Sequence, residues 1–137
     1  MRTSQRVKAI EPSPIRRIID LAGSRPEIIG LHAGEPDFPT PQHIVEAGSR
    51  ALQDGYTHYT HGAGLIQLRE AISRKLLDEN GIEANPKTET TVTAGGFAAI
   101  FATIQATIDP GDEVIVLQPS WPSYSGFVRL AGGIPVP

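Results

Sequence analysis

Residues 89–117 read ETTVTAGGFAAIFATIQATIDPGDEVIVL, and this stretch decides the fold. Its first part, residues 89–94, is rich in alternating β-branched side chains and predicts a strand. After the Gly95-Gly96 pair, residues 97–108 are apolar on most sides and predict a largely buried helix. The apolar run of residues 113–117 predicts a second strand, of the kind that parallel sheets bury on both faces.

The chain continues with a predicted helix over residues 123–130 and a strand that begins at Ile134. The order β-α-β-α-β predicts an α/β fold with a parallel-type sheet and flanking helices. Two or three strands make a poor sheet, and the sequence stops inside the last strand. We therefore expect an incomplete sheet and a chain that is the N-terminal portion of a larger protein.

The first half of the sequence predicts helices separated by Gly- and Pro-rich connections. The expected elements are a helix over 14–22, a short strand over 28–31, a helix over 41–53 capped by Thr40, and a helix over 65–79 that ends at a left-handed Gly81.

Composition excludes several classes of protein. The 137 residues are 39% hydrophobic and 20% charged, with a formal net charge of −3, so neither wholesale disorder nor a nucleic-acid partner is indicated. Cysteine is absent, which excludes disulfides and thiolate chemistry. We see no signal peptide and no membrane span, and we expect a cytoplasmic protein.

The turn between the first strand and its helix is a candidate anion site. Backbone N–H groups at a helix N-terminus attract a phosphate, and glycine lets the anion approach closely. The sequence Thr93-Ala94-Gly95-Gly96-Phe97-Ala98 has this pattern, but a Gly pair is also common in plain turns. A dinucleotide site is not indicated, because no G-x-G-x-x-G motif is present.

Three other groups carry possible chemistry. Trp121 and Tyr124 follow the second strand, where an aromatic ring can stack on a flat cofactor or simply pack the loop. His58 and His61 form half of a metal-ligand pattern without an obvious third ligand, so we expect no metal site. Residues 34–37 (Gly-Glu-Pro-Asp) are either a ligand-contacting loop or a stiff surface loop.

Seven motifs stand in a fixed order along the chain: Ala33-Gly34-Glu35-Pro36-Asp37-Phe38, Tyr56-Thr57-His58-Tyr59, Leu68-Arg69-Glu70-Ala71-Ile72, Val92-Thr93-Ala94-Gly95-Gly96, Asp109-Pro110-Gly111-Asp112-Glu113-Val114-Ile115, Pro119-Ser120-Trp121 and Ala131-Gly132-Gly133. Their order and spacing resemble the class I aminotransferases, which are fold-type I enzymes dependent on pyridoxal 5′-phosphate (PLP). The resemblance implies the aspartate aminotransferase-like fold of PLP-dependent transferases.

The resemblance also implies roles for individual residues. Backbone N–H groups of Gly96, Phe97 and Ala98 are expected to bind the PLP phosphate, and Trp121 is expected to stack on the pyridine ring. Tyr59 matches a tyrosine that reaches the phosphate bound by the neighbouring subunit, which implies a homodimer with a shared active site.

Gly34 matches a loop glycine near the substrate carboxylate. By the same resemblance, residues 1–40 are an N-terminal arm or small-domain segment, and residues 41–137 are the beginning of the PLP-binding large domain.

The catalytic groups of the family are expected downstream of this stretch. They are a lysine that forms a Schiff base with the cofactor, an acid on the pyridine nitrogen and an arginine for the substrate carboxylate. Lys8, Lys75 and Lys87 do not stand in a matching context, so the 137-residue chain alone is expected to be inactive.

The full-length parent is expected to transfer an amino group between an L-amino acid and a 2-oxo acid. The alternatives are another fold-type I PLP enzyme such as a lyase, a non-catalytic phosphate-binding α/β module, and a short gene product that serves only as a dimerisation partner.

Overall fold

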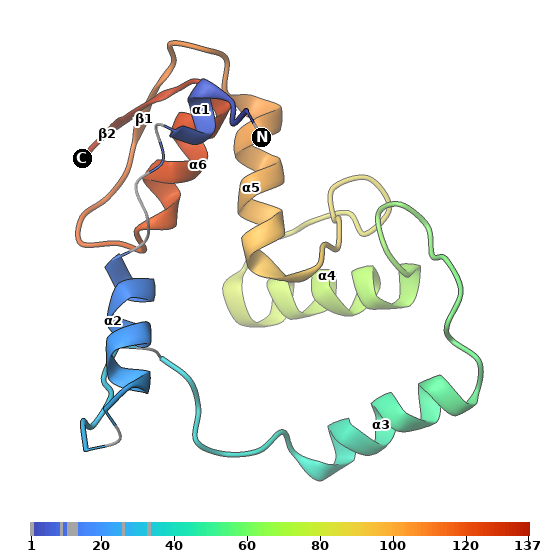
Figure 1. The fold of residues 1–137 in the computed structure, drawn as a ribbon. Coiled ribbons are helices and arrows are strands. Elements are labelled where there is room, and N and C mark those ends of the chain that lie inside the picture. Colours follow the sequence, from blue (N-terminus) through green and yellow to red (C-terminus); the bar gives the residue numbers. More distant parts are fainter. Residues whose placement is uncertain (1, 9, 11–13, 26, 33) are drawn as a thin grey trace. The chain divides into compact units, whose positions relative to one another are not determined.

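The chain forms two compact units, and Figure 1 labels their helices and strands. The computed structural model describes residues 2–8, 10, 14–25, 27–32 and 34–137. One unit comprises Met1–Glu35 and Ile100–Pro137, and the other comprises Pro36–Ala99. Helix α5 (Gly95–Thr107) begins in the second unit and ends in the first. No helix among the described residues is long and apolar enough to cross a membrane.

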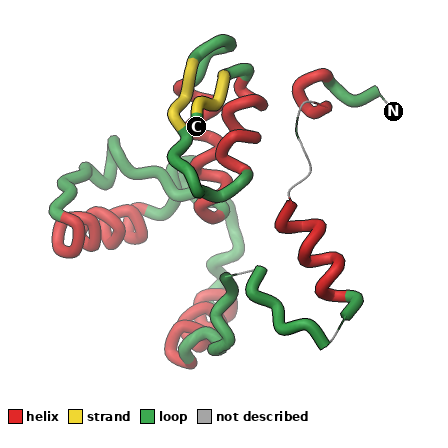
Figure 2. The backbone as a smooth tube through the Cα atoms, turned by 90° about the vertical axis from the view of Figure 1, so that its left-hand side faces the viewer, coloured by secondary structure: helices red, strands yellow, loops and turns green. Residues whose placement is uncertain are grey.

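The first unit contains a small parallel sheet. Strand β1 (Glu113–Ile115) pairs with β2 (Ile134–Val136), with Glu113 opposite Ile134. The Asp112 carbonyl accepts the Ile134 N–H at 2.7 Å, so the hydrogen-bond ladder begins at the first residue of β2. Figure 2 shows the two strands side by side, as the register requires. The predicted parallel arrangement and the start of the last strand are confirmed.

Helix α6 (Ser123–Ala131) joins the two strands and covers the sheet. Its residues Phe127 and Val128 are buried with Val116, and these are the buried hydrophobic side chains of the described residues. The helix ends at Gly132 with φ 89°, and the next residue, Gly133, has no room for a side chain. A Cβ there would lie 2.9 Å from Ile108 Cγ2 and 3.1 Å from the Asp112 carbonyl oxygen. Glycine therefore lets the α6–β2 corner close.

Two helices lie in the N-terminal segment of this unit, within the residues that the structure describes. They are α1 (Gln5–Lys8), which contacts α6, and α2 (Pro14–Gly23), as the sequence predicts for the second. Ser13, expected to cap α2, lies outside the described residues.

The second unit contains α3 (Gln42–Gln53), α4 (Ile66–Asn80) and the connections that lead to α5. Helix α4 ends as predicted, because Gly81 adopts φ 66° and its N–H bonds back to the Leu77 carbonyl. The expected cap of α3 is wrong. Its N-cap residue is Pro41 without a side-chain bond, since the helix begins one residue later than Thr40 could reach.

Two predicted strands are absent from the described structure. Residues 28–31 and 89–94 are irregular, and residues 86–89 form a turn. Strand structure requires a ladder of hydrogen bonds to a neighbouring strand. In the described residues, the Val92 N–H donates to the Ala63 carbonyl at 3.0 Å, but no ladder forms with residues 54–65. Strand β1 is likewise shorter than the predicted 113–117, and Ile115 and Leu117 are 77% and 80% exposed.

Candidate functional site

The turn at the start of α5 is held in place by its own hydrogen bonds. The Gly95 N–H donates to the Thr93 carbonyl at 2.8 Å, and the Thr93 hydroxyl donates to the Gly95 carbonyl at 2.8 Å. Gly95 has φ 82°, a backbone conformation that residues with a Cβ atom rarely adopt. The turn therefore requires glycine at position 95, as predicted. Helix α5 begins at Gly95, two residues earlier than expected.

The same turn has the electrostatics of an anion site. The first turn of α5 contains no acidic residue, and the helix dipole places partial positive charge at this end. A Cβ built at Gly95 or Gly96 would meet nothing within 4 Å, so the backbone is open to a ligand from both glycines. The donor set and the open space fit a phosphate group.

The Trp121 indole lies in the first unit, beyond the carboxyl end of β1. Its ring is 5.4 Å from the Tyr124 ring and 6.0 Å from the Phe127 ring, with interplanar angles of 78° and 72°. These T-shaped pairs fix the plane of the indole against α6. Trp121 remains 38% exposed, so its contacts with the loop and α6 leave part of the indole surface accessible.

The remaining predicted site residues are exposed. Tyr59 lies on the connection between α3 and α4 and is fully exposed. Gly34 is exposed and has open space where a Cβ would stand. Gly96, Phe97 and Ala98 share one helical turn, in the unit that also contains Tyr59, whereas Trp121 and Gly34 belong to the other unit.

His58 and His61 are not part of a metal-ligand cluster within the described residues, where no group of three candidate ligands occurs. The His61 Nδ1 atom instead accepts the Ala63 N–H at 3.1 Å and shapes the local turn.

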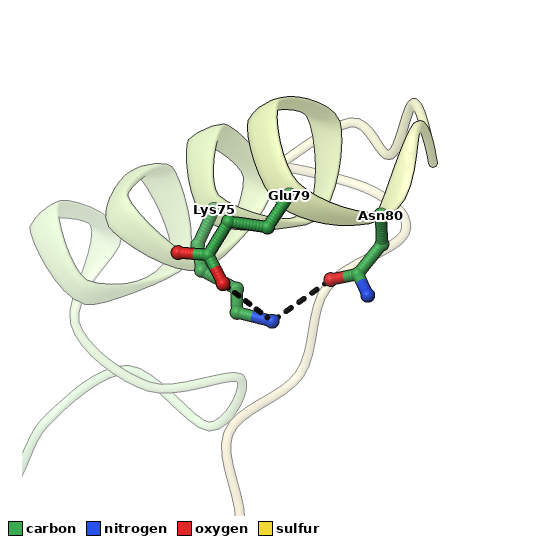
Figure 3. A network of polar contacts seen from close by, with 3 residues as sticks. All are labelled: Lys75, Glu79 and Asn80. Atoms are coloured by element: carbon green, nitrogen blue, oxygen red, sulfur yellow. Dashed lines mark hydrogen bonds and ion pairs between the residues drawn. The ribbon is translucent and has the colours of Figure 1, made fainter.

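Lys75 is a surface residue, as expected. Its Nζ lies 3.2 Å from Glu79 Oε2 and 2.8 Å from Asn80 Oδ1 at the end of α4 (Figure 3). A lysine bound to these exposed partners is a solvated charge rather than a nucleophile.

Sequence reasoning missed the burial of Arg69. Its side chain is only 6% exposed, on the inner face of α4. The spacing holds the signal, because Arg69 lies four residues after Leu65 and three before Ile72 on the predicted apolar face.

A parallel pair of strands joined by a helix defines the α/β class of fold. Comparison with known proteins identifies the family. Residues 26–137 match the family "Aminotransferase class I and II", and the chain belongs to it. The predicted resemblance is confirmed, and membership implies PLP as the cofactor.

Curated relatives and solved structures agree. The chain is 51% identical to the probable aspartate/prephenate aminotransferase of Thermus aquaticus and 47% identical to the aspartate/prephenate aminotransferase of Thermus thermophilus. The alignments cover 97% of this chain but 36% and 35% of those relatives, so the chain spans about a third of their length.

The fold prediction is also confirmed. Pyrococcus protein-A1 superposes with a TM-score of 0.91 at 46% identity, covering 96% of this chain and 34% of that one. A double mutant of Thermus thermophilus aspartate aminotransferase gives 0.90 at 48% identity, covering 99% and 37%. The fold is that of the aspartate aminotransferase-like PLP enzymes.

Proposed function

We propose that this chain supplies the phosphate-binding part of a PLP-dependent aminotransferase, which transfers an amino group between an L-amino acid and a 2-oxo acid. The observation that carries the proposal is the open space at Gly95 and Gly96, at the N-terminus of α5, in a chain that matches the aminotransferase family over residues 26–137. When bound, the cofactor supplies an electron sink for the substrate Cα.

In this proposal the N–H groups of Gly96, Phe97 and Ala98 bind the phosphate and fix the cofactor's position. The positive φ of Gly95 supports it, because this backbone conformation turns the chain sharply into α5. Trp121 holds the ring by stacking, supported by its fixed plane and remaining exposed surface. Gly34 lies near the substrate carboxylate.

We further propose a homodimer in which the Tyr59 hydroxyl donates a hydrogen bond to the phosphate bound by the neighbouring subunit. A tyrosine that is fully exposed within its own chain is free to make such a contact. The domain boundary near residue 40, a cytoplasmic location and a role in amino-acid biosynthesis belong to the same proposal. The names of the two Thermus relatives make aspartate and prephenate the first substrates to test.

The test uses the purified full-length gene product. We expect it to bind PLP with an absorption band that borohydride abolishes, and to transfer the amino group of aspartate to prephenate or another 2-oxo acid. A colourless protein that does not bind PLP would overturn the proposal in favour of a phosphate-binding module. Release of ammonia or thiol without amino transfer would identify a lyase instead.

A further inference from the structure

We propose that Arg69 is a positioning residue for the phosphate-binding turn, and this inference rests on the proposed function of that turn. One guanidinium nitrogen, Nη1, donates to the Pro86 carbonyl at 3.0 Å and to the Lys87 carbonyl at 3.4 Å. The arginine thereby ties α4 to the segment that runs from residue 85 to the turn at Gly95.

The chemistry of this contact is unusual for a structural residue. Arginine stays charged, and burial of a charge destabilises a fold unless its donors are satisfied. Here the reported acceptors are neutral backbone carbonyls, and Nε is buried without a hydrogen-bond partner among the described residues. An apolar side chain would serve simple packing better. The guanidinium contributes geometry, because one nitrogen of this planar group, Nη1, contacts the carbonyls of two successive peptide groups.

The clamped peptides belong to a turn that is itself rigid. The Lys87 N–H donates to Asn85 Oδ1 at 2.8 Å, and the Glu89 N–H donates to the Asn85 carbonyl at 2.9 Å. The Glu89 carboxylate in turn accepts the Asn85 N–H at 2.7 Å. Fixing residues 86 and 87 therefore fixes residues 85–89 as a unit.

Three further contacts hold the segment between this turn and the glycines. The Thr90 hydroxyl lies 3.3 Å from the Ser73 hydroxyl of α4, and Thr90 is buried. The Val92 side chain packs on Gly64, where a Cβ would come within 2.7 Å of Val92 Cβ. Val92 also donates its N–H to the Ala63 carbonyl at 3.0 Å. The segment reaches Thr93 with little freedom, so a change at Arg69 is transmitted to Gly95.

A purely structural staple and a positioning residue predict different measurements. Loss of a purely structural contact lowers the stability of the protein and weakens the binding of pyridoxal and of PLP by the same factor. Loss of positioning weakens the phosphate contact selectively. The ratio of the dissociation constants for pyridoxal and for PLP isolates that contact, since the two ligands differ in the phosphate.

The experiment measures this ratio for the cofactor-free, full-length gene product and for Arg69→Lys and Arg69→Met. Arg74→Met controls for loss of a cation from an exposed position of the same helix. Gly81→Ala controls for stability, because Gly81 has φ 66° at the end of α4 and open space around it. Thr90→Val interrupts the same link without removing a charge, and serves if the Arg69 variants do not fold.

We expect both Arg69 variants to lower the ratio by about tenfold, the value of one displaced hydrogen bond to a charged group. Thr90→Val should lower it by a smaller factor, roughly threefold, since this variant removes one contact of the segment and leaves the Arg69 hydrogen bonds in place. The two controls should leave the ratio unchanged, even where Gly81→Ala lowers the melting temperature.

An unchanged ratio in Arg69→Lys and Thr90→Val, with lower melting temperatures, would overturn the inference and leave the proposed function intact. A wild-type protein that binds pyridoxal as tightly as PLP would overturn the proposed function itself, and the positioning role with it.

Discussion

Replacing Gly95 by alanine probes the phosphate-binding turn most sharply. Gly95 has φ 82°, and a Cβ there would meet no atom within 4 Å. The substitution therefore introduces backbone strain without a steric clash. For an L-residue this conformation is unfavourable by about 1–2 kcal/mol. We expect that loss in the free energy of unfolding, or a relaxed turn that avoids it.

A relaxed turn moves the N–H groups of α5 away from their positions. Each charge-assisted hydrogen bond lost to the phosphate corresponds to about tenfold in affinity. Gly95→Ala should therefore bind PLP at least tenfold more weakly, while its affinity for pyridoxal changes little. Urea unfolding gives the stability, and fluorescence titration with the two ligands gives the affinities.

Gly111→Ala is the matched control. Gly111 has φ 98°, and its surroundings are equally open, but it lies in the 109–112 turn. The same strain should appear there as a similar loss of stability, without selective loss of PLP. Equal PLP affinities for wild type and Gly95→Ala, or equal losses in both variants, would refute the reasoning.

Further predictions concern the stability of the chain and the role of Lys75. Gly133→Ala should lower the free energy of unfolding by about 1–3 kcal/mol in a urea titration, because its Cβ would overpack against Ile108 and Asp112; a neutral effect would show that the α6–β2 corner is loose. Lys75→Met should change stability by less than about 1 kcal/mol and leave the PLP absorption band intact, since the ion pair with Glu79 is exposed; loss of the band would contradict the surface assignment. The isolated 137-residue chain should aggregate or unfold without a sharp calorimetric transition, since Val116, Phe127 and Val128 are the buried hydrophobic side chains of its described residues; a sharp transition would count against this expectation.

The helices α2 to α6 and the strand β1 could be predicted because their signals are local, whereas α1 was not predicted. The parallel pairing of β1 with β2 followed from the β-α-β order. Gly81 marks the end of α4, and an apolar run bounded by a turn marks β1. The predicted strand over 89–94 failed because strand propensity describes one partner of a ladder, and no described segment pairs with these residues.

The candidate site also has one feature that could be predicted from the sequence and one that could not. The glycine turn at 95–96 could be predicted because glycine is required where φ is positive. The spacing along α4 places Arg69 on the predicted apolar face. Its acceptors, the Pro86 and Lys87 carbonyls, could not be predicted, because they lie 17 and 18 residues away in sequence. Such a contact depends on how the chain returns to α4, which periodicity does not specify.

The central proposal is that the start of α5 binds the cofactor phosphate and that the Trp121 indole stacks on the cofactor ring. A crystal structure of the full-length gene product grown with PLP tests it most directly. We expect phosphate oxygens about 3 Å from the backbone nitrogens of residues 96–98, with the pyridine ring flat on the indole. A phosphate bound elsewhere, or an indole at the opposite end of the sheet, would contradict the account.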